Sequence, residues 1–231
     1  MVQINPTKLF LRFKLKKTGS LQYISHLDLV RTMHKVIVRA KLPLWYTEGF
    51  NPKPKMIFAA PLSIGTESVC EFMDIRLNEY MDPAEAMARL NANMTQEMQV
   101  IEAYYPETKF TDLAWLSYTV CLDTKGADTD LVERCNSVLN SDKVEILKKT
   151  KSGENIVDIR PLIKSAEAEL RGEQIRIFCI LSADPSSFLN PEYVVKVLRE
   201  KCGILSEPDL TTESYTIMRE KAYCADMTEF K

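Results

Sequence analysis

Two histidines, His26 and His34, are the side chains in this sequence best suited to moving protons near neutral pH. Eight residues apart on a helix they would be separated by about 12 Å, too far to share a metal ion unaided. His26 lies among Lys and Arg residues, and nearby positive charge lowers the pKa of an imidazole. Its position fits a general base acting on a ribose hydroxyl, with Tyr23 or Lys53 nearby. The interpretation that we favour is a ring that helps to cap the helix or packs under the loop at Pro52 and Pro54.

Other catalytic classes lack the residues they need. The six cysteines include no closely spaced pair, which disfavours zinc and iron–sulfur sites and predicts reduced thiols in the core. Only Asp28 and Glu48 are acidic within the first 60 residues, too few for a two-metal phosphodiesterase. The seven glycines are dispersed, so no phosphate-binding glycine-rich loop is present. We therefore expect neither a metal nor a cofactor.

Charge is divided sharply along the chain. Residues 1–60 carry eleven Lys or Arg and two acids, a net charge of 11 − 2 = +9. The remaining residues carry 30 − 11 = 19 basic and 32 − 2 = 30 acidic groups, a net charge of −11. Such segregation indicates a surface for a polyanion such as RNA, either tRNA or rRNA. A solvated basic face, or one that docks on the acidic remainder of the same chain, is the alternative.

Three elements would position the basic residues. Alternating polarity predicts a strand over residues 7–17 with a wet, cationic face. Ser25 to Asp28 has the form of a helix cap, and the helix that follows has an apolar stripe. Residues 49–55 (GFNPKPK) predict a stiff cationic loop, which we expect beside His26 at the start of that helix. The candidates for contact with RNA phosphate are Arg12, Lys14, Lys16, Ser25, His26, Arg31, Lys35, Phe50, Asn51, Lys53 and Lys55.

Two aromatic residues are candidates for base stacking. Phe10 and Phe72 are expected on the polar faces of two neighbouring strands, flanked by Arg12, Lys14 and Arg76. Exposed rings among cations are typical of RNA-binding sheets. The alternative is that this face is covered by the rest of the chain and that the rings belong to an interface.

The order of predicted elements repeats. Strand, helix, two strands, helix and strand fill residues 1–107, and residues 114–231 follow the same order with one strand too many. The second half has a predicted hairpin around residues 152–153, whose second strand runs over 156–166, and a further strand over 175–181. The extra strand is the one at Ile156 or the one at Ile175. The pattern predicts an α+β fold of two tandem ferredoxin-like (βαββαβ) units with antiparallel sheets. No signal peptide or long apolar run is evident, so we expect a cytoplasmic protein that does not contact the membrane.

Several motifs together resemble the bacterial radical-SAM-linked protein family. They are residues 13–18, 24–29 (ISHLDL), 49–55, 60–62 with Gly65, and the late run 217–219 (IMR). This family is a domain of unknown function encoded beside or fused to a radical SAM protein, often near ribonuclease and ribosomal-protein genes. The resemblance implies a role in RNA metabolism and a radical SAM partner. The chain lacks the three-cysteine cluster motif of radical SAM enzymes, so any radical chemistry would belong to that partner.

Three functional hypotheses follow. The first is a non-catalytic RNA-binding adaptor or accessory protein that works with a radical SAM partner. The second is a metal-independent endoribonuclease using His26, suggested by a fold-level similarity to CRISPR repeat-processing endoribonucleases. The third is a protein–protein interaction module that does not contact RNA.

Overall fold

The structure is a computed structural model that describes residues 9–150, 153–207 and 211–231. It consists of two compact units: unit 1 runs to Phe110 and includes Lys231, and unit 2 spans Thr111–Phe230. The sequence predicted domains at 1–107 and 114–231, and the chain passes from one unit to the other between those bounds. Each unit combines two α-helices with an antiparallel sheet, which confirms the predicted α+β class.

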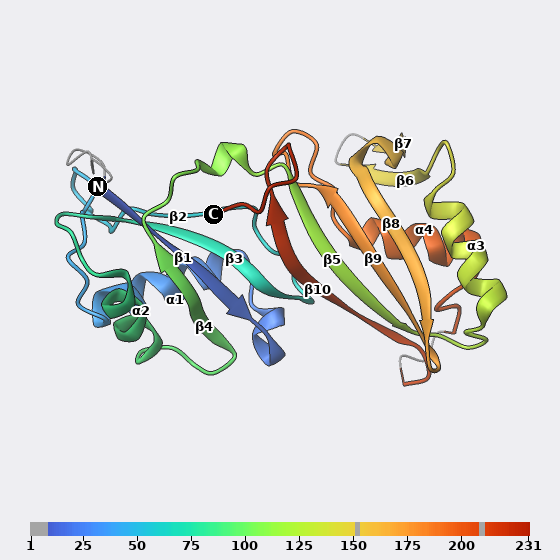
Figure 1. Cartoon of the computed structure of the whole chain (residues 1–231), viewed down its shortest axis with the longest axis horizontal. Coiled ribbons are helices and arrows are strands. Elements are labelled where there is room, and N and C mark those ends of the chain that lie inside the picture. Colours follow the sequence, from blue (N-terminus) through green and yellow to red (C-terminus); the bar gives the residue numbers. More distant parts are fainter. Residues whose placement is uncertain (1–8, 151–152, 208–210) are drawn as a thin grey trace. The chain divides into compact units, whose positions relative to one another are not determined.

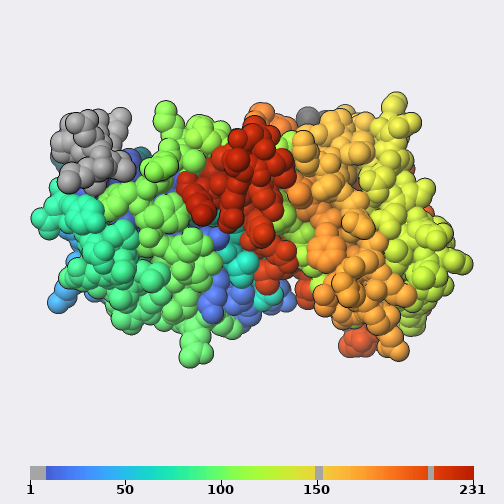
Figure 2. All heavy atoms as spheres, in the orientation of Figure 1, coloured from blue at the N-terminus to red at the C-terminus, as the bar shows by residue number. Residues whose placement is uncertain are grey.

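Unit 1 is built from four strands and two helices. In chain order they are β1 (Leu9–Lys17), α1 (His26–Arg39), β2 (Met56–Phe58), β3 (Thr66–Leu77), α2 (Pro83–Asn91) and β4 (Met98–Tyr104), with a short 3-10 helix at Gly19–Tyr23. The sheet order is β4-β1-β3-β2, and each neighbouring pair is antiparallel (Figure 1). In the space-filling view, α2 and β4 form much of the near surface of this unit (Figure 2).

The core of unit 1 lies between its sheet and its two helices. Leu11 and Phe13 of β1 are fully buried, as the alternation of β1 predicts. Met33 and Ile37 of α1 and Leu90 of α2 belong to the same buried cluster. Both helices therefore cover one face of the sheet, and the other face carries the polar side chains of β1.

Unit 2 repeats this arrangement with an added hairpin. Its elements are β5 (Trp115–Asp123), α3 (Thr129–Leu139), β6 (Glu145–Thr150), β7 (Gly153–Asp158), β8 (Ile163–Arg171), β9 (Gln174–Ser182), α4 (Glu192–Cys202) and β10 (Ser214–Tyr223). The main sheet has the order β10-β5-β9-β8, again antiparallel (Figure 1). β6 and β7 form a separate two-stranded sheet.

The structure confirms the predicted hairpin and corrects the length of its second strand. The predicted single strand over residues 156–166 is two strands, β7 and β8, separated by a 3-10 turn at Arg160–Leu162. Pro161 explains the break, because proline has no N–H to donate to a strand ladder. The strand that seemed superfluous therefore belongs to an inserted hairpin. Ser152, predicted at its turn, lies outside the described residues.

An asparagine on a helix holds an edge strand in both units. At the end of α2, the Asn91 side chain donates to the Val100 carbonyl of β4 at 2.9 Å and accepts from the Val100 amide at 2.7 Å. On α3, Asn136 makes the same pair of bonds with Ala168 of β8, at 2.9 and 2.8 Å. We call these paired bonds the asparagine clamps. Each fixes one helix against the outermost strand beside it.

Burial makes several of the cysteines poor nucleophiles. All six are free thiols, and Cys70, Cys135, Cys179 and Cys202 are buried. Burial raises the pKa of Cys135 and of Cys179 to about 12, so both are protonated near neutral pH. In the described parts of the chain, no three His, Cys, Asp or Glu side chains are grouped to hold a metal ion. Over the same residues, no helix is both long and apolar enough to cross a membrane.

Candidate nucleic-acid interface

The polar face of β1 is not the wet surface that the sequence predicted. Arg12, a candidate for phosphate binding, is 1% exposed. Its guanidinium makes a two-pronged ion pair with Asp74, at 2.7 and 2.9 Å. It also donates to the hydroxyl and carbonyl of Thr108 and to the carbonyl of Lys231, and lies over the Phe110 ring at 4.4 Å. These bonds use all five N–H donors, so Arg12 is a structural residue that cannot bind phosphate in this conformation.

The remaining candidates on this sheet face are also covered or paired. Lys14 donates to Glu102 at 2.9 Å, and its side chain is 15% exposed. Phe72 is 3% exposed, so it cannot stack on a nucleobase as predicted. Phe10 and Lys16 are half-buried. The alternation of β1 located this face correctly but could not reveal what covers it.

The start of α1 already holds a negative charge. The Ser25 hydroxyl accepts from the Asp28 amide at 3.1 Å and donates to the Asp28 carboxylate at 2.8 Å, which forms the predicted cap. The bonds from Ser25 and then Arg31 lower the pKa of Asp28. An ionised carboxylate at a helix N-terminus is itself stabilised by the positive end of the helix dipole, and it repels a phosphate. Ser25 and this end of α1 are therefore weak candidates for phosphate binding.

His26 has a packing contact. Its ring meets Phe58 edge-on, with 5.7 Å between ring centroids. In the part of the chain that the structure describes, no side chain is hydrogen-bonded to the His26 ring. This geometry matches the packing role weighed for His26 and adds no partner for proton transfer.

The solvent face of α1 is strongly basic. Arg31, Lys35 and Arg39 are spaced four residues apart, so they lie along one side of the helix, and all three are exposed. His34, half-buried beside them, has a pKa lowered by burial and by the charge of Lys53. His34 is therefore mainly neutral at pH 7. Lys53 is thus close enough to α1 for its charge to act on His34, and the expected place of the loop beside His26 stays a prediction.

The predicted loop is the tip of a longer projection, residues 44–55, which we call the arm. The Thr47 amide donates to the Lys53 carbonyl at 2.9 Å, and the Lys55 amide donates to the Trp45 carbonyl at 3.1 Å. The Lys53 amide also donates to the Thr47 hydroxyl at 3.1 Å. Bonds between the main chains of Trp45, Lys55 and Arg76 fix the base of the arm to β3, and the Arg76 guanidinium lies 3.9 Å above the Trp45 ring.

The arm exposes polar, cationic and aromatic side chains along its outer and returning part. Asn51, Lys53 and Lys55 are exposed, and Phe50 is 106% exposed. Gly49 has φ +126°, a conformation that L side chains rarely adopt, and it allows the chain to turn at the tip.

The arm and α1 together form a basic surface. We define it by Arg31, Lys35, Arg39, Lys53 and Lys55. Residues 26–58 hold six Lys or Arg against two acids, a net charge of 6 − 2 = +4. One of the acids, Asp28, is paired with Arg31 at 3.0 Å. The other four residues of the basic surface, Lys35, Arg39, Lys53 and Lys55, are exposed, so the surface is suited to contact with a phosphate backbone.

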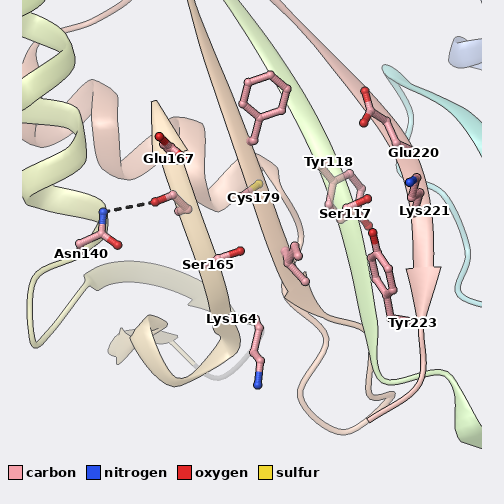
Figure 3. A pocket seen from close by; sticks show the side chains of 13 residues that line it. Ser117, Tyr118, Asn140, Lys164, Ser165, Glu167, Cys179, Glu220, Lys221 and Tyr223 are labelled. Atoms are coloured by element: carbon pink, nitrogen blue, oxygen red, sulfur yellow. Dashed lines mark hydrogen bonds between the residues drawn. The ribbon is translucent and has the colours of Figure 1, made fainter. Parts of the chain in front are cut away.

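A hollow on unit 2 was not predicted from the sequence. It has a volume of about 460 Å³ and lies along β8, β9, β5 and β10 (Figure 3). Phe178, 41% exposed, contributes to its lining. Its charged lining residues are Lys164, Glu167, Glu220 and Lys221. Two ammonium groups and two carboxylates favour no single ligand charge. The sequence signal for it is the alternation of β9, which puts Phe178 on the same face of the strand as Arg176.

The structure therefore defines an α+β protein with two antiparallel units, the first of which has a basic arm. The model of a family described as "uncharacterized protein conserved in bacteria" (DUF2344) matches residues 11–191. The chain belongs to this family.

Comparisons with other proteins add little about function. No curated protein matches the sequence. Among solved structures, the chain is similar to one in the crystal structure of a Cbf5-Nop10-Gar1 complex, with 11% identity and a TM-score of 0.49. The match covers 92% of this chain and 48% of that one, so this chain spans about half its length. An unknown protein from Galdieria sulphuraria has 11% identity and a TM-score of 0.26, with coverage of 92% and 98%. Likenesses this weak support no argument about function.

Proposed function

We propose that the protein is a non-catalytic RNA-binding accessory protein that binds RNA through the basic surface. The observation that carries this proposal is the exposure of the cations of α1 and of the arm, on two elements that the contact between His26 of α1 and Phe58, just beyond the arm, brings close together. Phosphate groups bound there would release condensed counterions, which is the main source of affinity in such complexes. Because Arg12 is buried and Lys14 is paired, the proposed site of RNA contact is α1 and the arm instead of β1.

The fold proposed for this protein is a tandem pair of ferredoxin-like units. The sheet order β4-β1-β3-β2 of unit 1 supports it, because it is the 4-1-3-2 order of a βαββαβ unit. In unit 2, β5, β8, β9 and β10 take the same four places, with the β6–β7 hairpin inserted after α3. An experimental structure with a different strand order in either unit would contradict this assignment.

The proposed partner is a radical SAM protein. This part rests on the resemblance of residues 24–29 and 49–55 to the radical-SAM-linked family. The acidic remainder of the chain, with a net charge of −11, is a suitable surface for protein contact. Purification of the tagged chain from its native cells tests the assignment, because a radical SAM protein should be recovered with it. Recovery of RNA without such a protein would remove the partner from the proposal.

The RNA-binding proposal is tested by the salt dependence of affinity. We expect the association constant to fall with salt by about 0.7 log units per log unit for each phosphate contact with single-stranded RNA. Lys53→Ala combined with Lys55→Ala should reduce this slope by about 1 to 1.5. Lys143→Ala combined with Lys201→Ala, at two exposed lysines of unit 2, is the control with the same change in net charge. Equal slopes for both double variants would contradict the proposed site.

The ribonuclease hypothesis has a separate test. A metal-independent nuclease using His26 would cleave RNA in the presence of a chelator, and His26→Ala would abolish that cleavage. The edge-on contact between His26 and Phe58 gives the ring a structural role, so we expect no such cleavage. Chelator-resistant cleavage that depends on His26 would make the protein an enzyme.

A further inference from the structure

We propose that the arm recognises an unpaired nucleotide, with its base stacked on Phe50 and the adjacent phosphates held by Lys53 and Lys55. This inference rests on the proposed function and specifies the kind of RNA that the basic surface binds. It is based on the exposure of Phe50, on the way the arm is held, and on the charges around it.

Phe50 contributes no buried area to the fold. Its relative exposure of 106% means that the whole ring is in contact with solvent. Tyr46, lower on the arm, is 43% exposed. A fully exposed phenylalanine gains free energy only when something covers the ring, so its contribution to stability comes from a bound partner.

The arm holds this ring on a pinned support. The two main-chain bonds across the arm join residues 45 to 55 and 47 to 53, and they leave residues 48–52 as a short tip. Pro52 and Pro54 restrict φ next to the lysines. The base of the arm is bonded to Arg76 of β3. A support that is ordered before binding lowers the entropic cost of binding, as expected for a recognition element.

The charges around Phe50 favour a nucleotide over an apolar protein pocket. Lys53 and Lys55 follow the ring within five residues, and Arg31, Lys35 and Arg39 extend the positive charge along α1. A ring with cations beside it matches a base with phosphates on either side. The acidic residue of the arm, Glu48, comes before Gly49 in the sequence, whereas both lysines come after Phe50.

A projecting ring distinguishes unpaired from paired RNA. In an A-form duplex the faces of internal bases are covered by their neighbours, and a protein contacts mainly phosphates and 2′-hydroxyls. An unpaired base presents a free face. Loss of one base–aromatic stack weakens binding by about 5- to 150-fold, as measured for aromatic-to-alanine changes in single-strand-binding proteins.

The test compares two RNA probes by fluorescence anisotropy. One is an unstructured strand of about 12 nucleotides, within the usual range of site sizes, and the other is a blunt duplex of the same length. Phe50→Ala should weaken binding of the single strand by about 5- to 150-fold and that of the duplex by less than about 2-fold. Phe50→Tyr should restore binding of the single strand. Ultraviolet crosslinking of the wild-type complex should attach the strand at Phe50.

The outcomes separate this inference from the proposed function. An equal loss on both probes with Phe50→Ala, or no loss on either, overturns base stacking and leaves phosphate binding by Lys53 and Lys55 intact. Failure of the wild-type protein to bind either RNA overturns the proposed function itself. If Phe50 binds a partner protein in place of RNA, the wild-type protein should bind neither RNA probe. Because Phe50 makes no buried contact, the variant should retain the fold, and Trp45 fluorescence checks this.

Discussion

Replacement of Arg12 by methionine should destabilise unit 1 severely. The change keeps much of the aliphatic length of the side chain but removes the five donors that bond to Asp74, Thr108 and Lys231. The side chains of Arg12 and Asp74 are 1% and 11% exposed, so solvent cannot replace the lost bonds. Removing one partner from a buried ion pair costs about 3–5 kcal/mol, because the other charge is left uncompensated.

The two tryptophans allow this loss to be measured in each unit separately. Trp45 lies in unit 1 and Trp115 in unit 2, and the sequence has no other tryptophan. In a Trp115→Phe background, urea unfolding followed by fluorescence reports on unit 1. Arg12→Met should lower the free energy of unfolding by about 3–5 kcal/mol. Arg12→Met with Asp74→Leu should lose less than Arg12→Met alone, since no charge remains buried.

The pH dependence supplies a second readout. Burial raises the pKa of Asp74 and the Arg12 charge opposes that rise, so Arg12→Met should raise this pKa further. A carboxyl whose pKa is higher in the folded state binds more protons there than in the unfolded state. The penalty of the variant should therefore shrink as the pH falls through the folded pKa of Asp74 towards the unfolded value of about 4. A loss below about 1 kcal/mol, unchanged by pH, would refute the structural role of Arg12.

Three further predictions follow from single contacts. Gly19→Ala should cost about 1–2 kcal/mol in urea unfolding followed by Trp45, because φ is +61° and a Cβ would lie 2.3 Å from the Glu97 carboxylate, which binds Ser20; an unchanged midpoint would contradict this. Asn136→Ala should weaken the hold on β8 by about 1–2 kcal/mol and speed hydrogen exchange at the Ala168 amide, and equal exchange would contradict the clamp. The Thr124 hydroxyl and two main-chain amides lower the pKa of Glu213, so it contributes stability above its unfolded pKa that is lost as the pH falls through the folded one. Glu213→Gln should flatten that acid limb, followed by Trp115 fluorescence in a Trp45→Phe background; an identical limb would contradict the prediction.

The fold was predictable where local pattern determines it. The alternation over residues 7–17 identified β1 and its buried face, and the capping signal at Ser25 located the start of α1. The hairpin around residues 152–153 was predicted, but its second strand was wrongly extended to residue 166, because the break between β7 and β8 at Arg160–Leu162 was not recognised. A local pattern carries no information about tertiary position, so it could not show that β6 and β7 form a sheet of their own.

The candidate site was predictable only in part. The composition of residues 49–55 indicated a stiff cationic loop, and the structure has it as the exposed tip of the arm. The sequence also assigned Arg12 and Phe72 to an open surface. Thr108 and Lys231, which bond to Arg12, lie 96 and 219 residues away along the chain. A period-2 pattern separates the two faces of a strand but cannot show whether distant segments cover the polar one.

The asparagine clamps bear on how this protein associates with others. An edge strand normally offers free N–H and C=O groups to which another chain can add a strand. At Val100 of β4 and Ala168 of β8, a side-chain amide already occupies both groups, in the way a neighbouring strand would. An incoming strand would have to break two hydrogen bonds and displace a helix before it could pair there. At these two positions the edge strands are thereby protected against pairing with another strand.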